Sequence, residues 1–171
     1  MKVVIVGCGR VGALVAETLD AAGHGVLVID IDSEAFERLA STFGGRTIRG
    51  DGTDEDVLRK ADATDADFFL AVTEGDNRNV IATQLAAEVL GARRVVAKVN
   101  DPLRAAAYAE LGIATLCRTN LMADAIQEYL GMPRLYEDGV QVPRGHHPGG
   151  EHHETPGRVG EGIAVPATEE G

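Results

Sequence analysis

The chain has 171 residues, of which 44% are hydrophobic and 25% are charged, a composition typical of one soluble globular domain. Its formal net charge of -11 argues against a general binder of nucleic acid or of anionic membranes, because phosphate groups attract a basic face. The two cysteines, Cys8 and Cys117, are too few and too far apart for a zinc motif or a disulfide framework. No stretch approaches the roughly 18 consecutive apolar residues of a membrane span, so we expect no direct membrane insertion.

Strand-like and helix-like segments alternate over residues 1–131. The apolar runs that predict strands are 2–6, 26–30, 46–50, 67–72, 94–99 and 114–117. The segments between and after them predict helices over 11–23, 33–43 with Ser33 as N-cap, 55–61 with Asp54 as N-cap, 77–90, 102–111 beginning at Pro102, and 120–130 with Thr119 as N-cap. Because the strands are continuously apolar, we expect a parallel sheet of about six strands with helices on both faces, in a doubly wound, Rossmann-like α/β fold.

The character of the sequence changes after Gly131. Residues 132–143 mix apolar and polar side chains without periodicity and predict an irregular extension. Residues 144–171 are rich in Gly, Pro, Glu and His, and they predict a disordered tail because they hold too little apolar surface to offset the entropy of ordering. Paired histidines in this tail are able to bind transition metals, but no cysteine or fixed secondary structure supports a site, and we predict none.

The first predicted strand runs into a Gly-x-Gly-x-x-Gly turn that opens the first predicted helix. Gly7 would permit the tight turn, Gly9 would let a pyrophosphate approach the backbone, and Gly12 would let the helix pack closely on the strand. Asp30, at the end of the second strand, would accept hydrogen bonds from the adenosine ribose and would repel a 2′-phosphate. This pattern favours NAD, ATP or ADP over NADP, and the alternative is a turn whose glycines serve packing alone.

Arg10 stands inside the turn, at a helix start where the helix dipole disfavours a cation. Its guanidinium would reach phosphate oxygens of a ligand bound by its own subunit or by a neighbour. The alternative is a solvated arginine.

Polar residues also follow the third, fourth and fifth predicted strands. Asp51 and Thr53 either bond the base or cap the next helix, and Thr73 faces the crevice where open α/β sheets bind ligands. Lys98 would meet a phosphate or pair with an acidic neighbour.

The groups that a dehydrogenase needs for proton relay are missing from the predicted domain. Its only histidine is His24, and Tyr108 is followed four residues later by Gly112 rather than by lysine. We therefore expect a protein that is not an enzyme. An NAD-dependent oxidoreductase fragment remains an alternative, and it would require a proton donor that the sequence does not suggest.

Five stretches in order, KVVIVGCGRVGALVAETL, VLVIDID, GDGTDEDVL, AVTEGDNRNVIAT and VVAKVNDP, closely resemble the N-terminal nucleotide-binding (RCK N-terminal, TrkA-N) domain of Trk/Ktr-type potassium-uptake regulatory proteins. The resemblance covers about residues 1–131. It implies a cytoplasmic, non-catalytic subunit, held at the inner face of the plasma membrane by its partner, that gates a potassium transporter or channel in response to NAD(H) or ATP/ADP. It further implies dimers, and often rings.

Carried over residue by residue, the resemblance implies a cofactor-binding set of three parts. The phosphate side would be Gly7, Gly9, Arg10, Val11 and Gly12; the ribose side Asp30 and Ile31; and the adenine side and crevice Asp51, Gly52, Thr53, Thr73 and Lys98. Two ligands with different phosphate ends would favour different dimer arrangements, and Arg10 is the candidate sensor of that end.

The sequence departs from the family in one respect. Many members continue into a second RCK domain, whereas here 40 residues follow Gly131. A single-domain member, a half that works with another polypeptide, and a truncated chain all remain open, as does an assembly domain for another transporter.

Overall fold

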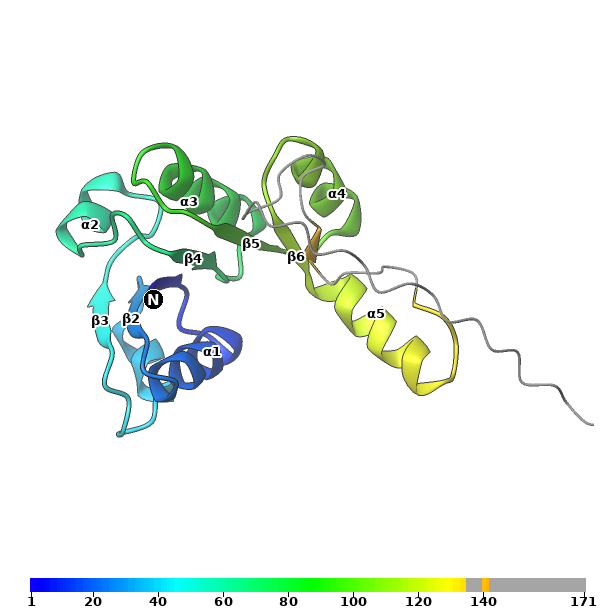
Figure 1. Cartoon of the computed structure of the whole chain (residues 1–171), viewed down its shortest axis with the longest axis horizontal. Coiled ribbons are helices and arrows are strands. Elements are labelled where there is room, and N and C mark those ends of the chain that lie inside the picture. The colour runs from blue at the N-terminus through cyan, green and yellow to red at the C-terminus, as the bar shows by residue number, and fades with distance from the viewer. Residues whose placement is uncertain (135–139, 142–171) are drawn as a thin grey trace, which may run out of the picture.

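The computed structural model describes residues 1–134 and 140–141, which form one sheet with helices on both faces (Figure 1). The strands are β1 (Lys2–Val6), β2 (Gly25–Asp30), β3 (Arg46–Arg49), β4 (Phe68–Ala71), β5 (Val95–Val99), β6 (Thr115–Cys117) and β7 (Val140–Gln141). The helices are α1 (Arg10–Ala21), the 3₁₀ helix η1 (Ser33–Arg38), α2 (Glu55–Lys60), α3 (Asp76–Glu88), α4 (Pro102–Glu110) and α5 (Arg118–Tyr129). The predicted tail, 144–171, lies outside the described residues, as does most of the predicted extension, 132–143.

The strand order is β3-β2-β1-β4-β5-β6-β7, and every pair from β3 to β6 is parallel. The chain begins in the middle of the sheet, builds outward to β3, and then returns to the other side of β1 to form β4. This reversal between β1 and β4 is the topological switch point of a doubly wound fold, so the predicted fold class is confirmed. β7 adds an antiparallel edge within the segment predicted to be irregular, pairing Val140 with Leu116.

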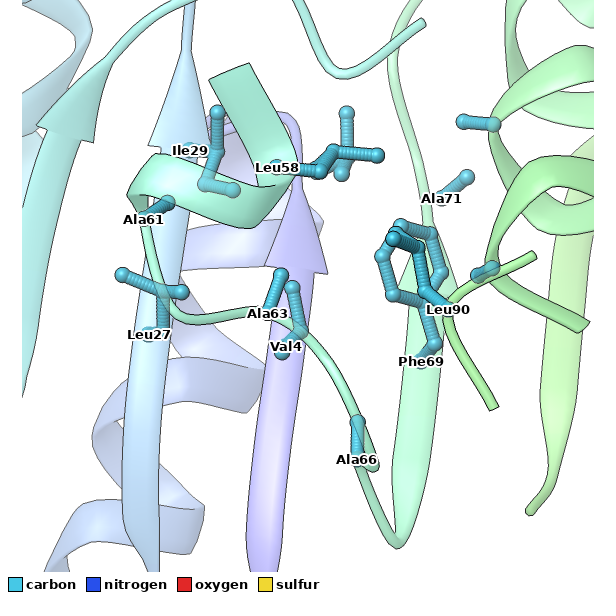
Figure 2. Packing of buried hydrophobic residues seen from close by; sticks show 13 residues of the cluster. Val4, Leu27, Ile29, Leu58, Ala61, Ala63, Ala66, Phe69, Ala71 and Leu90 are labelled. Atoms are coloured by element: carbon cyan, nitrogen blue, oxygen red, sulfur yellow. The ribbon is translucent and has the colours of Figure 1, made fainter. Parts of the chain in front are cut away.

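Alternate residues of the central strands β1, β2 and β4 enter two hydrophobic clusters, one on each face of the sheet. On one face, Val4 and Phe69 pack with Leu58 of α2 and with small residues of α3 (Figure 2). On the other, Val3 and Ile5 pack against Ala13 and Ala16 of α1. Burial on both faces explains why the strands are continuously apolar. The alanines of the helices are small, so the helices pack close to the sheet and the core needs few aromatic side chains.

The prediction of a helix over 33–43 with Ser33 as N-cap is wrong in the length of the helix and in the capping residue. It is a 3₁₀ helix that ends at Arg38, and the N-cap is Asp32, whose carboxylate accepts from Glu34 N at 3.0 Å. Carboxylates of α1 bind the backbone that follows, since Glu17 accepts from Ala40 N at 2.6 Å and Asp20 accepts from Gly44 N at 2.7 Å. These tertiary bonds replace the helical bonds that the segment would otherwise form.

The predicted caps of the later helices have mixed outcomes. Asp54 accepts from two N–H groups at the start of α2, as predicted. Thr119 does not cap α5, which begins one residue earlier; its hydroxyl donates to the Asn100 carbonyl at 2.6 Å. None of the helices in the described ranges combines the length and the apolar character required to cross a membrane.

Candidate functional site

A cavity of about 470 Å³ lies at the carboxyl ends of β1, β2 and β4, at the switch point of the sheet. Its size is in the range of small-molecule and cofactor sites. Four parts of the chain line it: the glycine turn (Val6–Arg10), the end of β2 with η1 (Ile29–Asp32, Ala35 and Arg38), the loop after β3 (Gly50 and Gly52), and the end of β4 with the start of α3 (Val72–Glu74 and Arg78).

The three glycines of the turn face different surroundings. Gly7 has φ +106°, and a Cβ there would lie 2.9 Å from Thr73 N, while a Cβ at Gly12 would lie 1.9 Å from the Gly7 carbonyl oxygen. The fold alone therefore requires glycine at both positions. A Cβ at Gly9 would meet nothing within 4 Å, so the fold does not explain this glycine. Gly9 remains the predicted point of approach for a ligand.

The N-terminus of α1 borders the same cavity. Gly9 is its N-cap, no side chain caps it, and its first turn carries no acidic residue. An uncapped helix N-terminus presents backbone N–H groups and the positive end of the helix dipole to an anion. The exposed Arg10 lines the cavity here, and its side chain makes no hydrogen bond or ion pair with the rest of the described chain.

Asp30 joins the end of β2 to the glycine turn. One carboxylate oxygen accepts from Cys8 N at 2.6 Å and the other accepts from Asp32 N at 2.9 Å. Each carboxylate oxygen retains a second acceptor position, which a ribose hydroxyl is able to fill. Burial, and then the Asp30 charge, raises the pKa of the Cys8 thiol, so this thiol in the cavity wall stays protonated at neutral pH.

The loop after β3 is held by an internal turn. Asp51 accepts from Thr53 N at 2.9 Å and from Thr53 Oγ1 at 2.8 Å, and these bonds lower the pKa of the Asp51 carboxyl. Gly52 lines the cavity, and a Cβ there would lie 2.2 Å from Val6. Asp51 and Thr53 themselves do not line it, and they act on its shape through this turn.

Lys98 lies beside the cavity rather than on its wall. The residue is 5% exposed, and its ammonium lies 3.7 Å from the carboxylate of the exposed Glu74, which does line the cavity. Of the two expectations for Lys98, the structure shows the acidic neighbour.

The predicted set thus divides in two. The residues on the cavity wall are Gly7, Gly9, Arg10, Asp30, Ile31, Gly52 and Thr73, and those off it are Val11, Gly12, Asp51, Thr53 and Lys98. Ligand contact by any of them remains a prediction.

Two arginines on the wall escaped the sequence reasoning. Arg38 ends η1 and Arg78 lies in the first turn of α3. A signal existed for Arg78, because a cation in the first turn of a helix opposes the dipole, as Arg10 does. No local signal distinguishes Arg38, which reaches the cavity only because η1 folds back over the end of β2.

Comparison with known proteins agrees with this architecture. Residues 3–119 match the TrkA-N domain family. The chain is 44% identical over 152 residues to "Trk system potassium uptake protein TrkA" of Streptomyces coelicolor, covering 85% of this chain and 68% of that protein. It is 35% identical over 102 residues to a TrkA homolog of Pyrococcus abyssi, covering 60% of this chain and 45% of the relative.

Among solved structures, the AMP-bound C-terminal domain of Kef from Shewanella denitrificans superposes with a TM-score of 0.62 at 25% identity, covering 75% of this chain and 79% of that one. The chain thus spans about two thirds of its Streptomyces relative and less than half of its Pyrococcus relative. The family match covers more than half of the chain, and the chain belongs to the TrkA-N domain family.

Proposed function

We propose that this protein is a nucleotide-binding regulatory subunit of a potassium-uptake system and that its ligand, NAD(H) or ATP/ADP, occupies the cavity at the switch point. One observation carries the proposal: the uncapped N-terminus of α1, the open space at Gly9 and the Asp30 carboxylate all border a single cavity. Phosphates would lie against the N-terminus of α1, and the ribose would bond Asp30.

The distribution of charge supports an anionic ligand. The whole chain carries a net charge of -11, yet three arginines, Arg10, Arg38 and Arg78, line this cavity and balance the carboxylates of Asp30, Asp32 and Glu74 on the same wall. Guanidinium groups bind phosphate oxygens in pairs of parallel hydrogen bonds, so their gathering here favours a ligand that carries phosphate.

A regulatory rather than catalytic role fits the cavity wall. In the part of the chain that the structure describes, no His, Tyr, Ser or Lys lines the cavity, and Cys8 has a raised pKa. Hydride transfer to a substrate requires a proton donor or acceptor beside the cofactor, and the candidates on the wall are the carboxylates of Asp30, Asp32 and Glu74 and the Cys8 thiol, of which we assign Asp30 to the ribose.

The names of the relatives point to the partner. The Streptomyces and Pyrococcus proteins are named as parts of Trk potassium-uptake systems, so we infer an integral-membrane potassium transporter as the partner. The protein would then be cytoplasmic and would reach the membrane through that partner. Ligands with different phosphate ends would favour different arrangements of the assembly, and Arg10 would sense the difference.

A homo-oligomer is part of this proposal. The last described helix, α5, extends away from the sheet (Figure 1) and exposes Leu121, Met122, Ile126 and Tyr129, and the exposed Leu130 follows it directly. An apolar helix face of this kind needs a covering surface. A second copy of the chain supplies one with matching apolar character.

Isothermal titration of the full chain with AMP, ADP, ATP, NAD, NADH and NADP tests the proposal. We expect at least one adenine nucleotide without a 2′-phosphate to bind, and Asp30→Ala to weaken it about tenfold or more. Asp56→Ala removes an exposed acid of α2 away from the cavity and should leave the affinity unchanged. The absence of binding by every nucleotide, or hydride turnover on a small substrate, would contradict the proposal.

A further inference from the structure

Asn79, in the first turn of α3, is fully buried at 0% exposure directly behind the cavity wall. Its amide oxygen accepts from Thr73 N at 2.8 Å and from Thr73 Oγ1 at 2.7 Å. Its amide nitrogen donates to the carbonyl of Thr73 at 3.0 Å and to the carbonyl of Lys98 at 2.9 Å. All four hydrogen-bonding positions of the amide are filled, and the two carbonyls and the N–H fix which atom is nitrogen.

This arrangement determines the direction of the Thr73 hydroxyl bond. The Asn79 oxygen is only an acceptor, so the single hydrogen of Thr73 Oγ1 points toward it. Of the two acceptor positions on Oγ1, one receives the Gly75 N–H at 3.3 Å. Thr73 lines the cavity, and its hydroxyl therefore has no donor and one acceptor position for a ligand.

We propose that Asn79 is a positioning residue that makes Thr73 an acceptor, so that Thr73 selects a ligand by an N–H or O–H group and not by a phosphate oxygen. A phosphate oxygen would meet the lone pairs of Oγ1 and be repelled. On an adenine nucleotide, the groups that fit are the ribose hydroxyls and the 6-amino group of the base. This inference rests on the proposed function and deepens it.

The test compares ADP with three analogues that each lack one donor: 2′-deoxy-ADP, 3′-deoxy-ADP and purine riboside 5′-diphosphate. Calorimetry on the full chain should show that one analogue binds about five- to tenfold more weakly than ADP. Thr73→Val should weaken the binding of ADP by a similar factor, and the variant should bind ADP and that analogue with equal affinity. Thr73→Ser, which keeps the hydroxyl, should retain the difference.

The role of Asn79 is tested through the ratio of the affinity for ADP to the affinity for the weaker analogue. A purely structural role would change the melting temperature without changing this ratio. Asn79→Ala frees the Thr73 hydroxyl to rotate and should reduce the discrimination toward that of Thr73→Val. Asn79→Asp keeps an acceptor oxygen for the Thr73 hydroxyl and should preserve the discrimination, but it loses both bonds to the carbonyls of Thr73 and Lys98 and should lower the melting temperature. Should Asn79→Ala not fold, the affinity ratio in Asn79→Asp decides the role of Asn79, and the Thr73 variants decide the role of the hydroxyl.

If ADP binds and Thr73→Val weakens ADP and all three analogues equally, or has no effect, the inference is overturned and nucleotide binding stands. If the wild-type chain binds none of the nucleotides, the inference and the proposed function are both overturned.

Discussion

Gly9 and Gly12 stand three residues apart in one turn, and different constraints act on them. Gly12 lies where a Cβ would come within 1.9 Å of a backbone oxygen, so the close contact between α1 and the turn excludes any other residue. Gly9 has φ -74°, which every residue adopts, and a Cβ there has no neighbour within 4 Å. Folding explains the second glycine, and we propose that the first serves binding.

We therefore expect Gly9→Ala and Gly12→Ala to separate these two properties. Gly12→Ala should lower the free energy of unfolding by about 2 kcal/mol or more, because backbone must shift to admit the methyl group. Gly9→Ala should cost about 1 kcal/mol or less and should still weaken nucleotide binding at least about tenfold, because the methyl group takes the place of a phosphate. Urea denaturation and calorimetry measure both. Unchanged affinity in a folded Gly9→Ala variant would contradict the assignment of the phosphate side.

The site residues that the sequence predicts correctly are those whose position follows from a local sequence pattern. The spacing of the glycines and the position of Asp30 after an apolar run place both at the carboxyl edge of a parallel sheet before any tertiary contact is known. Asn79 acts through contacts with distant parts of the chain, as its 2.9 Å bond to the Lys98 carbonyl shows, and Arg38 lines a cavity whose other walls come from distant parts of the chain. One sequence without those contacts does not distinguish them from other polar residues of a helix.

Among the helix N-caps, too, some follow from the local sequence and others do not. Asp54 and Asp101 bond N–H groups two and three residues ahead, so residue type and spacing predict the bond. Ser33 and Thr119 have the right chemistry for a cap, but Asp32 precedes the first and the Asn100 carbonyl binds the second. The Asp32 cap is itself a local bond, to Glu34 N, so at Ser33 the sequence offered two neighbouring candidates. At Thr119 a tertiary bond to the Asn100 carbonyl competes with the local one.

Helix α4 offers a clean measurement of one cap. Asp101 accepts from Leu103 N at 2.9 Å and from Arg104 N at 3.1 Å, and Pro102 occupies the first turn. Asp101→Ala should lower the free energy of unfolding by about 1 kcal/mol and Tm by about 2–4 °C, and Asp101→Asn should recover most of the loss. Thermal denaturation by circular dichroism measures both variants. Equal loss in both would show that charge, and not the cap bond, matters at this position.

For the molecule as a whole, the order of the strands in the sheet follows from the alternation of strand-like and helix-like segments in the sequence. Buried parallel strands joined by helices have few arrangements under right-handed crossovers, and the switch point then fixes where a ligand lies. β7 was not predictable in this way. It is two residues long and its pairing with β6 joins segments separated by the whole of α5.

The apolar face of α5 makes a prediction about assembly. Ile126 is 53% exposed on α5, and Ile81 is 50% exposed on α3, so the two match in residue type, helical setting and exposure. Burying an isoleucine stabilises an interface by about 1.5–3 kcal/mol, and a buried unpaired carboxylate opposes it further. If a second copy covers α5, Ile126→Glu should raise the dimer dissociation constant about tenfold or more, whereas Ile81→Glu should leave it unchanged. Light scattering over a dilution series measures the mass, and circular dichroism confirms that both variants stay folded. A folded Ile126→Glu chain with the mass of the wild type at every concentration would remove α5 from the interface.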